Sequence, residues 1–172
     1  MIDMTTHEIA QLLADTMIGR LCMADSDGTP YAIPLPFCWA EGALYLRLPL
    51  TGRKGDVLSR NDRVCFEIDT FTATLDDYAS VLVEGRLVEV TSIDEKQRIK
   101  PITDAKYDRL RAGHRPGHGR ATPLSALPLR KILVTRLSGK RKEPAPEKLQ
   151  NEPNRGGCPD SALDVLLATS MR

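Results

Sequence analysis

The chain has 172 residues and carries 24 Lys and Arg against 23 Asp and Glu, a formal net charge of +1. With 41% hydrophobic and 27% charged residues, it has the composition of a globular protein and not that of a disordered one. Folding at this length removes about two-thirds of the unfolded surface from water, so a single domain needs neither disulfides nor a metal for stability.

The near-zero net charge is the sum of three unlike segments. Residues 1–97 hold 8 basic and 16 acidic side chains, residues 98–142 hold 13 and 2, and residues 143–172 hold 3 and 5. The basic segment offers few aromatic side chains for base stacking besides Tyr107, so we expect no nucleic-acid binding. We expect it to face solvent or the entrance to a site for an anionic ligand.

Targeting signals and metal motifs are absent from the sequence. No apolar run approaches the ~20 residues that cross a bilayer, and no secretory signal is visible, so we expect a cytoplasmic protein without membrane contact. His114 and His118 are separated by Pro116 and Gly117, which argues against a metal site. The cysteines form no Cys-x-x-Cys pair, and we expect them to be reduced, small apolar side chains: Cys22, Cys38, Cys65 and Cys158.

The first third of the chain predicts a helix and then short strands. A helix over residues 6–15 begins with Thr6 as its N-cap. Three consecutive antiparallel strands follow, over residues 17–24, 31–39 and 43–48. Pro34 and Pro36 have no N–H, so the second strand should lie at a sheet edge or be irregular, which leaves backbone groups available to a ligand.

The rest of the chain adds a few helices and the remaining strands. We expect helices over 51–60 and 93–110, a loop over 112–127, and strands over 63–69, 78–91 and 129–137. Gly85 suggests a bulge, and Pro101 should interrupt its helix. Consecutive short strands exclude a doubly wound α/β sheet and predict a mainly β fold, a small barrel with flanking helices. Residues 143–172 form a linker and tail, with a short docking helix over 161–171 as one option.

The segment from Leu50 to Asp56 carries the strongest chemical signal. Its Gly-Arg-Lys-Gly core, Gly52 to Gly55, puts a guanidinium, an ammonium and unpaired N–H groups at the start of a short helix. Helix starts favour anions, and arginine can bind two oxygens of a phosphate at once. The segment therefore predicts a phosphate-binding site, although a solvated pair of charges in a turn is the common alternative.

Five motifs in order resemble the pyridoxamine 5′-phosphate oxidase-like, FMN-binding split-barrel superfamily. They are Ile18-Gly19-Arg20-Leu21, the segment from Gly28 to Pro34, the segment from Gly42 to Leu46, Gly52-Arg53-Lys54 with Asn61 to Phe66, and the segment from Tyr78 to Arg86. The resemblance covers about residues 5–140 and is closest to the nitroimidazole-resistance-like branch. It implies a six-stranded antiparallel split β-barrel, formed by residues 1–142, in a homodimer with FMN between the protomers.

The resemblance also assigns roles to individual residues. Arg53 and Lys54 match the basic pair that holds the FMN phosphate, and Ser80 matches a polar position reached from the partner subunit. Two further groups border the flavin: Ile33, Pro34 and Leu35 in one strand, and Arg47 and Leu48 at the end of another. No side chain is assigned as a catalytic acid or base, because a flavin carries the redox chemistry itself.

One position departs from the branch and bears on the substrate. In the nitroimidazole-resistance-like branch, the strand that matches residues 43–48 often ends in a histidine near the substrate, and this chain has Arg47 there. The resemblance therefore supports FMN binding more than nitroimidazole reduction. We expect an FMN-dependent oxidoreductase that acts on a small organic substrate, with NADH or NADPH as a possible reductant. The alternatives are a non-enzymatic flavin- or haem-binding protein on the same barrel, with His7, His114 or His118 as haem ligand, and a deazaflavin-dependent reductase.

Overall fold

The computed structural model describes residues 1–111 and 122–142, which form one antiparallel sheet with helices around it. The strands are β1 (Ile2–Asp3), β2 (Ile18–Ala24), β3 (Pro30–Pro36), β4 (Cys38–Ala40), β5 (Ala43–Arg47), β6 (Arg63–Phe71), β7 (Tyr78–Glu89) and β8 (Leu129–Arg141). The helices are α1 (Thr6–Asp15), α2 (Arg53–Arg60), α3 (Ile93–Leu110) and the 3-10 turn η1 (Leu124–Ala126). Within these two ranges, no helix combines the length and apolar character that a membrane span requires.

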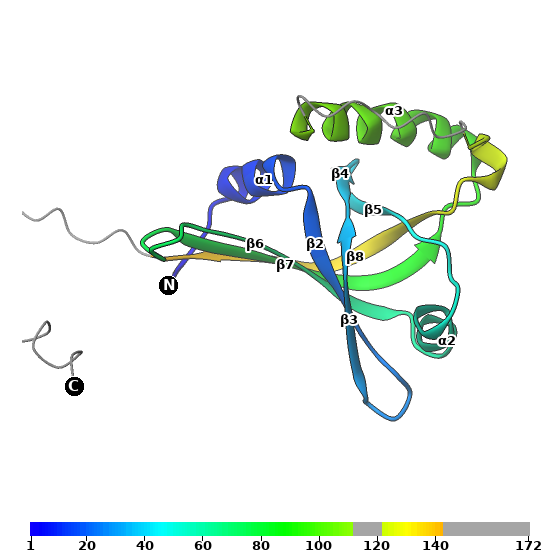
Figure 1. Ribbon diagram of the computed structural model, residues 1–172, viewed down its shortest axis with the longest axis horizontal. Coiled ribbons are helices and arrows are strands. Elements are labelled where there is room, and N and C mark those ends of the chain that lie inside the picture. Colours follow the sequence, from blue (N-terminus) through cyan, green and yellow to red (C-terminus); the bar gives the residue numbers. More distant parts are fainter. Residues whose placement is uncertain (112–121, 143–172) are drawn as a thin grey trace, which may run out of the picture.

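The sheet is curled into an open barrel, as its strand order requires. Hydrogen-bonded neighbours follow the order β3-β2-β6-β7-β8-β5-β4, and β1 adds to β8. The two ends of this order, β3 and β4, are separated along the chain by Phe37 alone. The sheet must therefore bend round until its ends meet, and Figure 1 shows this curvature.

The mainly β barrel expected from the sequence is confirmed, with two differences in its strands. The six predicted strands are present, and the short strands β1 and β4 bring the total to eight. The two antiparallel pairings of the expected meander are confirmed, since the first part of the strand predicted over 31–39 pairs with β2 and the second part with β5. The strand is divided at Phe37, however, so these pairings lie at opposite ends of the sheet, as where strands change partners at the corners of packed sheets.

Two expectations about the helices need correction. The N-cap of α1 is Thr5 and not Thr6, since the Thr5 hydroxyl accepts from the Glu8 N–H and the Glu8 carboxylate accepts from the Thr5 N–H. Helix α3 runs without a break through Pro101. Pro101 is exposed, so the carbonyl that loses its helical partner can be hydrated on the solvent side.

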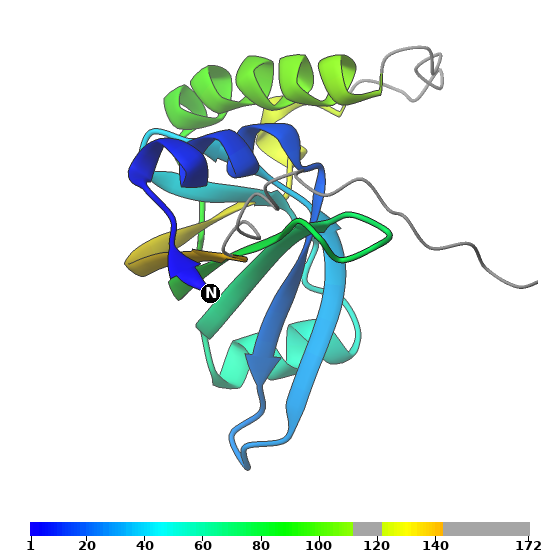
Figure 2. The same ribbon diagram turned by 90° about the vertical axis from the view of Figure 1, so that its left-hand side faces the viewer.

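The hydrophobic core fills the barrel and extends under two helices. Phe37 and Phe66 are fully buried inside, with ring centroids 5.3 Å apart, and α1 contributes Leu12 and Leu13 to the same cluster. A second cluster lies between α3 and the outer side of β4 and β5, which explains why β5 is buried on both faces. Helices α1 and α3 thus cover one end of the barrel, and α2 lies at the other (Figure 2).

The long strands β7 and β8 differ in detail from their predicted form. Their register shifts between Glu84 and Gly85, which confirms the predicted bulge. Strand β8 continues to Arg141, four residues past its predicted end. The loop with His114 and His118, most of which falls in residues 112–121, and the tail 143–172 with its possible helix and Cys158 lie outside the described residues.

Candidate functional site at the start of helix α2

The start of α2 is shaped by two glycines. Gly52, the N-cap, has φ +62°, a left-handed conformation that glycine adopts without strain. A Cβ added to Gly55 would lie 2.9 Å from the carbonyl carbon and oxygen of Leu50, so only glycine lets the preceding loop pack this closely on the helix. The Gly-Arg-Lys-Gly sequence therefore builds a tight loop that leads directly into the helix.

The two cations of this loop are held by different partners. The Arg53 guanidinium lies over the ring of Tyr31 in β3, with its central carbon 4.5 Å from the ring centroid. The Lys54 ammonium donates to the carbonyl oxygen of Thr51 at 3.1 Å and to its hydroxyl at 3.3 Å. Stacking restrains the plane of the guanidinium and leaves its N–H edges available to an anion.

Neither cation is neutralised within the described part of the chain. No carboxylate of residues 1–111 or 122–142 forms an ion pair with Arg53 or Lys54. The N–H groups of Gly55 and Asp56 are used by the Gly52 carbonyl, whereas those of Arg53 and Lys54 have no acceptor in the same ranges. The first turn of α2 thus carries two positive side chains and two N–H groups without acceptors in these ranges, and such donors suit a phosphate group.

Strand β3, which contacts the start of α2, has one edge without a strand partner in the described ranges. As Pro34 and Pro36 predict, β3 lies at the end of the sheet and pairs with β2 alone among the described strands. Ile33 and Leu35 are half-buried and pack on the barrel core, and Pro34 is exposed. Tyr31 links this edge to α2 through Arg53, so the structure brings Ile33, Pro34 and Leu35 to the same side of the barrel as the basic pair.

Helix α2 is fastened to the β2–β3 turn at its other end. The Arg60 guanidinium donates two hydrogen bonds to the Asp25 carboxylate, at 2.8 and 2.7 Å, and the Asn61 amide donates to the Ala24 carbonyl at 2.9 Å. The hydrogen bonds from Arg60 are the main reason why the pKa of Asp25 falls to about 2. These contacts fix the direction in which α2 presents its first turn.

Arg47 and Leu48 lie in a different environment from the basic pair. The Arg47 guanidinium donates to Asp104 of α3 and lies 5.8 Å from the ring centroid of Tyr107. Its Nε is buried without a hydrogen-bond partner among the described residues. Leu48 is buried, and its carbonyl accepts a hydrogen bond from Arg130 of β8. No contact in the described ranges joins Arg47 to Arg53 or Lys54.

Ser80 is distant from α2 within one chain. It lies opposite Asp69 in β6 and opposite Lys140 in β8. Since β6 starts at Arg63, just after α2, Ser80 is roughly 20 Å along the strand from that end. One protomer therefore does not bring Ser80 to the basic pair.

Most of the described cations of the basic segment form ion pairs, which sequence reasoning missed. Eight cations of residues 98–142 bind carboxylates: Arg98 with Glu41, Lys100 with Asp104, Arg109 with Asp15, Arg130 with Glu89, Lys131 with Glu95, Arg136 with Glu84, Lys140 with Asp3 and Arg141 with Glu8. All of these acidic partners except Asp104 come from residues 1–97. Because strands and helices far apart in sequence lie side by side, the charges alternate in space.

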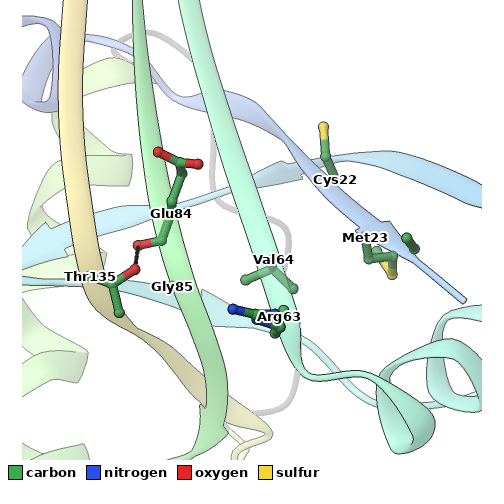
Figure 3. Close-up of a pocket in the computed structure, with 8 residues that line it drawn as sticks. Cys22, Met23, Arg63, Val64, Glu84, Gly85 and Thr135 are labelled. Carbon is green, nitrogen blue, oxygen red and sulfur yellow. Dashed lines mark hydrogen bonds between the residues drawn. The ribbon is translucent and has the colours of Figure 1, made fainter. Parts of the chain in front are cut away.

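Other features of the described residues offer less to a cofactor. A groove of about 430 Å³ lies on the sheet across β2, β6, β7 and β8, lined by Cys22, Met23, Ala24, Arg63, Val64, Glu84, Gly85 and Thr135 (Figure 3). A second groove, of about 380 Å³, lies between α1 and the β6–β7 end. In residues 1–111 and 122–142, no cluster of three metal-ligating side chains is present.

Comparison with protein families assigns the fold. The pyridoxamine 5′-phosphate oxidase family profile matches residues 5–141, most of the chain. The chain belongs to this family. The match spans every described element of the barrel from α1 to β8, including the Gly-Arg-Lys-Gly loop. A search of curated proteins gave no significant match.

Solved structures with a similar fold are known. A FAD-binding protein from Mesorhizobium loti is 26% identical, with a TM-score of 0.60 over 83% of this chain and 98% of the other. A candidate 5-nitroimidazole antibiotic resistance protein from Bacteroides thetaiotaomicron is 20% identical, with a TM-score of 0.63 over 81% and 86%. A FAD and heme binding protein from Mycobacterium smegmatis is 16% identical, with a TM-score of 0.61 over 98% and 92%. The last two similarities concern the fold.

Sequence reasoning found the basic pair but not its supports. Tyr31 and Thr51, which hold Arg53 and Lys54, carry no motif of their own. The spacing of Gly52 and Gly55 is the signal that could have revealed the tight loop, since two glycines around two cations leave room for close backbone packing.

Proposed function

We propose that this protein is a flavin-dependent oxidoreductase that binds FMN with its phosphate at the start of α2. The observation that carries the proposal is the first turn of α2, where Arg53, Lys54 and two unpaired N–H groups have no carboxylate partner in the described ranges and where Arg53 contacts Tyr31 of the edge strand β3. Membership of the pyridoxamine 5′-phosphate oxidase family supports the choice of a flavin over other phosphorylated ligands.

Each part of the site has a distinct task in this proposal. When bound, the flavin supplies the transfer of hydride or electrons. Arg53 and Lys54 hold the phosphate by charge-assisted hydrogen bonds, and Tyr31 keeps the guanidinium oriented. The backbone of Ile33, Pro34 and Leu35 borders the ring system at a sheet edge that has hydrogen-bonding capacity left over.

Arg47 and Leu48 are proposed to border the other side of the cofactor. The buried Nε of Arg47 is a donor without an acceptor in the described residues, so in this proposal it donates to a polar atom of the flavin or of the substrate. Its ion pair with Asp104 holds the guanidinium in place and reduces its net charge. Arg47 therefore contributes a hydrogen-bond donor and little net positive charge.

A homodimer completes the proposed site. Ser80 is too far from α2 to contact the same cofactor within one protomer, and it would reach the flavin of the partner. Exposed apolar side chains on β7 and β8 support an interface there: Leu82 is 38% exposed and Leu133 is 48% exposed. Sedimentation of the purified protein should give twice the mass of one chain, and a monomer that still binds flavin would contradict the shared site.

The first test is the absorption spectrum of the purified full chain, followed by titration with FMN, FAD and haem. We expect the bands of oxidised flavin, and FMN binding that weakens in the Lys54→Ala variant but not in Arg98→Ala, a paired cation on α3. A Soret band would favour the haem-binding alternative. A colourless protein that takes up none of the three ligands would contradict the proposal.

The second test concerns catalysis with the flavin-loaded protein. We expect NADH or NADPH to bleach the flavin, and a small organic acceptor to restore its colour. Binding of FMN without any reduction by either nucleotide would favour a flavin-storage role, and preference for a deazaflavin would change the cofactor but not the site. The cytoplasmic location expected from the sequence remains a prediction.

A further inference from the structure

Two of the cysteines, which are far apart in the sequence, lie opposite each other in the sheet. Cys22 in β2 and Cys65 in β6 are register partners in an antiparallel pair. Directly opposite residues in such pairs have Cα atoms about 4.5–5.5 Å apart and side chains on the same face, and disulfides span Cα separations of about 4.4–6.8 Å. The backbone is therefore already placed for a disulfide, although both thiols are free in this structure.

The two thiols differ in their access to solvent. Cys22 lines the groove of about 430 Å³ on the sheet, together with Arg63 and Glu84, whereas Cys65 is not part of the lining (Figure 3). Both side chains are half-buried, unlike Cys38, which is 1% exposed. A reagent in the groove would therefore meet Cys22 first.

The charges around the thiols support the same order. Burial raises the pKa of both thiols, and that of Cys65 rises to about 11, with the carboxylates of Glu84 and Glu67 adding to the shift. At Cys22 burial and the Glu67 carboxylate raise the pKa, and the Arg20 guanidinium partly offsets them. Since the thiolate is the attacking species, Cys22 is the better nucleophile, and reaction should speed up as the pH rises.

We propose that Cys22 and Cys65 form an oxidation site in which Cys22 attacks a disulfide reagent and Cys65 resolves the product into a cross-strand disulfide. With oxidised glutathione, the Cys22 thiolate attacks one sulfur, the glutathione S–S bond breaks and one glutathione thiolate leaves. The Cys65 thiolate then attacks the Cys22 sulfur, and the second glutathione leaves. The protein loses two electrons and two protons, which convert one oxidised glutathione into two thiols.

A disulfide between Cys22 and Cys65 should raise the melting temperature of the protein. The cross-link encloses residues 22–65, which include every residue proposed at the flavin except Ser80. A disulfide across such a loop restricts the unfolded chain, so the oxidised protein should melt about 5 °C or more above the reduced one. Reduction by dithiothreitol should reverse the shift. The site does not depend on flavin binding.

The test uses the full chain with Cys158→Ser, so that Cys22, Cys38 and Cys65 are its only thiols. After incubation with oxidised glutathione at pH 8.5, we expect the loss of two thiols, no retained glutathione and a peptide linked through Cys22 and Cys65. With Cys65→Ser added, one glutathione should stay on Cys22. With Cys22→Ser or Cys22→Ala added instead, Cys65 should react with oxidised glutathione at least about tenfold more slowly than Cys22 does in the Cys65→Ser variant.

Several results would overturn the proposal. They are a stable glutathione adduct on Cys22 while Cys65 is present, a disulfide that includes Cys38, and three unreacted thiols in a protein whose circular dichroism shows it to be folded. Equal rates for Cys22 in the Cys65→Ser variant and for Cys65 in the Cys22→Ser variant would overturn the assigned order of attack.

Discussion

The start of α2 and the basic segment 98–142 are both rich in positive charge, but their cations have different partners. Eight cations of the basic segment bind carboxylates, seven of which come from the acidic first part of the chain. Arg53 and Lys54 lie within that acidic part and have only an aromatic ring, a carbonyl and a hydroxyl as partners in the described ranges. The proposed anion site therefore lies where two cations lack a carboxylate partner in the described ranges, and not where the sequence has its excess of positive charge.

The difference has a physical reason. A cation that binds a carboxylate has little potential left to offer a ligand, and the exchange of one anion for another gains little free energy. A cation that binds a ring face or a neutral oxygen keeps its charge and needs an anion to complete its interactions. Variants that change the charge or the partner of a single cation can test this contrast.

Reversal of the charge of Lys54 should have the largest effect on FMN binding. Lys54→Glu replaces an attractive contact with repulsion at the phosphate, and we expect FMN to bind about 1,000-fold more weakly. Arg98→Glu on α3 is the matched control, because it also reverses a charge but leaves the start of α2 unchanged. Fluorescence quenching during FMN titration measures both. Equal losses in the two variants would mean that net charge and not position governs binding.

A third kind of cation is buried and should govern alkaline stability. Lys106 of α3 donates to the Leu13 carbonyl at 2.7 Å and lies 3.8 Å from the ring centroid of Phe37, and burial lowers its pKa from 10.5 to about 8. At this lysine the unfolded chain therefore binds more protons than the folded one between pH 8 and 10.5, so the contribution of Lys106 to the unfolding free energy should rise with pH in this window.

The matched variant for this effect is Lys106→Met, whose unbranched side chain is one atom shorter and does not titrate. Across pH 8 to 10.5 the wild type should gain about 3 kcal/mol relative to the variant, as measured by urea unfolding at each pH. Parallel stability curves for the two proteins would show that Lys106 does not change its protonation on unfolding.

The smallest effect is expected at the far end of α2. Arg60→Ala removes the two hydrogen bonds to Asp25 and should lower Tm by about 1 to 3 °C at neutral pH. Since the folded pKa of Asp25 is low, the contribution is present above its usual pKa of 3.8 and fades as the pH falls toward 2. The two Tm values should converge there. A constant difference down to pH 2 would assign the loss to packing instead.

The sequence revealed those features that depend on local chemistry. The prolines of β3 predict an edge strand, Gly85 predicts the bulge, and the Gly-Arg-Lys-Gly sequence predicts the tight loop at the start of α2. The interruption expected at Pro101 failed because solvent exposure lets the helix tolerate it. The change of partner at Phe37 could not be read locally, because it depends on closure of the whole barrel.

The partners of the charged residues were beyond the sequence for the same reason. Arg109 meets Asp15, and Arg98 meets Glu41, only after helix α3 docks on the barrel. The support of Arg53 by Tyr31 and the opposition of Cys22 to Cys65 also need β3, β2 and β6 to lie in register. Pairings between distant segments are set by tertiary packing, whereas caps, bulges and tight loops are set by the residues themselves.

The most direct test of the central claim compares two double variants in FMN titrations of the full chain. Arg53→Ala with Lys54→Ala removes two cations that have no carboxylate partner among residues 1–111 and 122–142, and Arg98→Ala with Arg109→Ala removes two paired cations of the basic segment. We predict that the first pair weakens FMN binding by at least about 100-fold and the second by less than about twofold. Equal weakening by both pairs, or none by the first, would contradict the account.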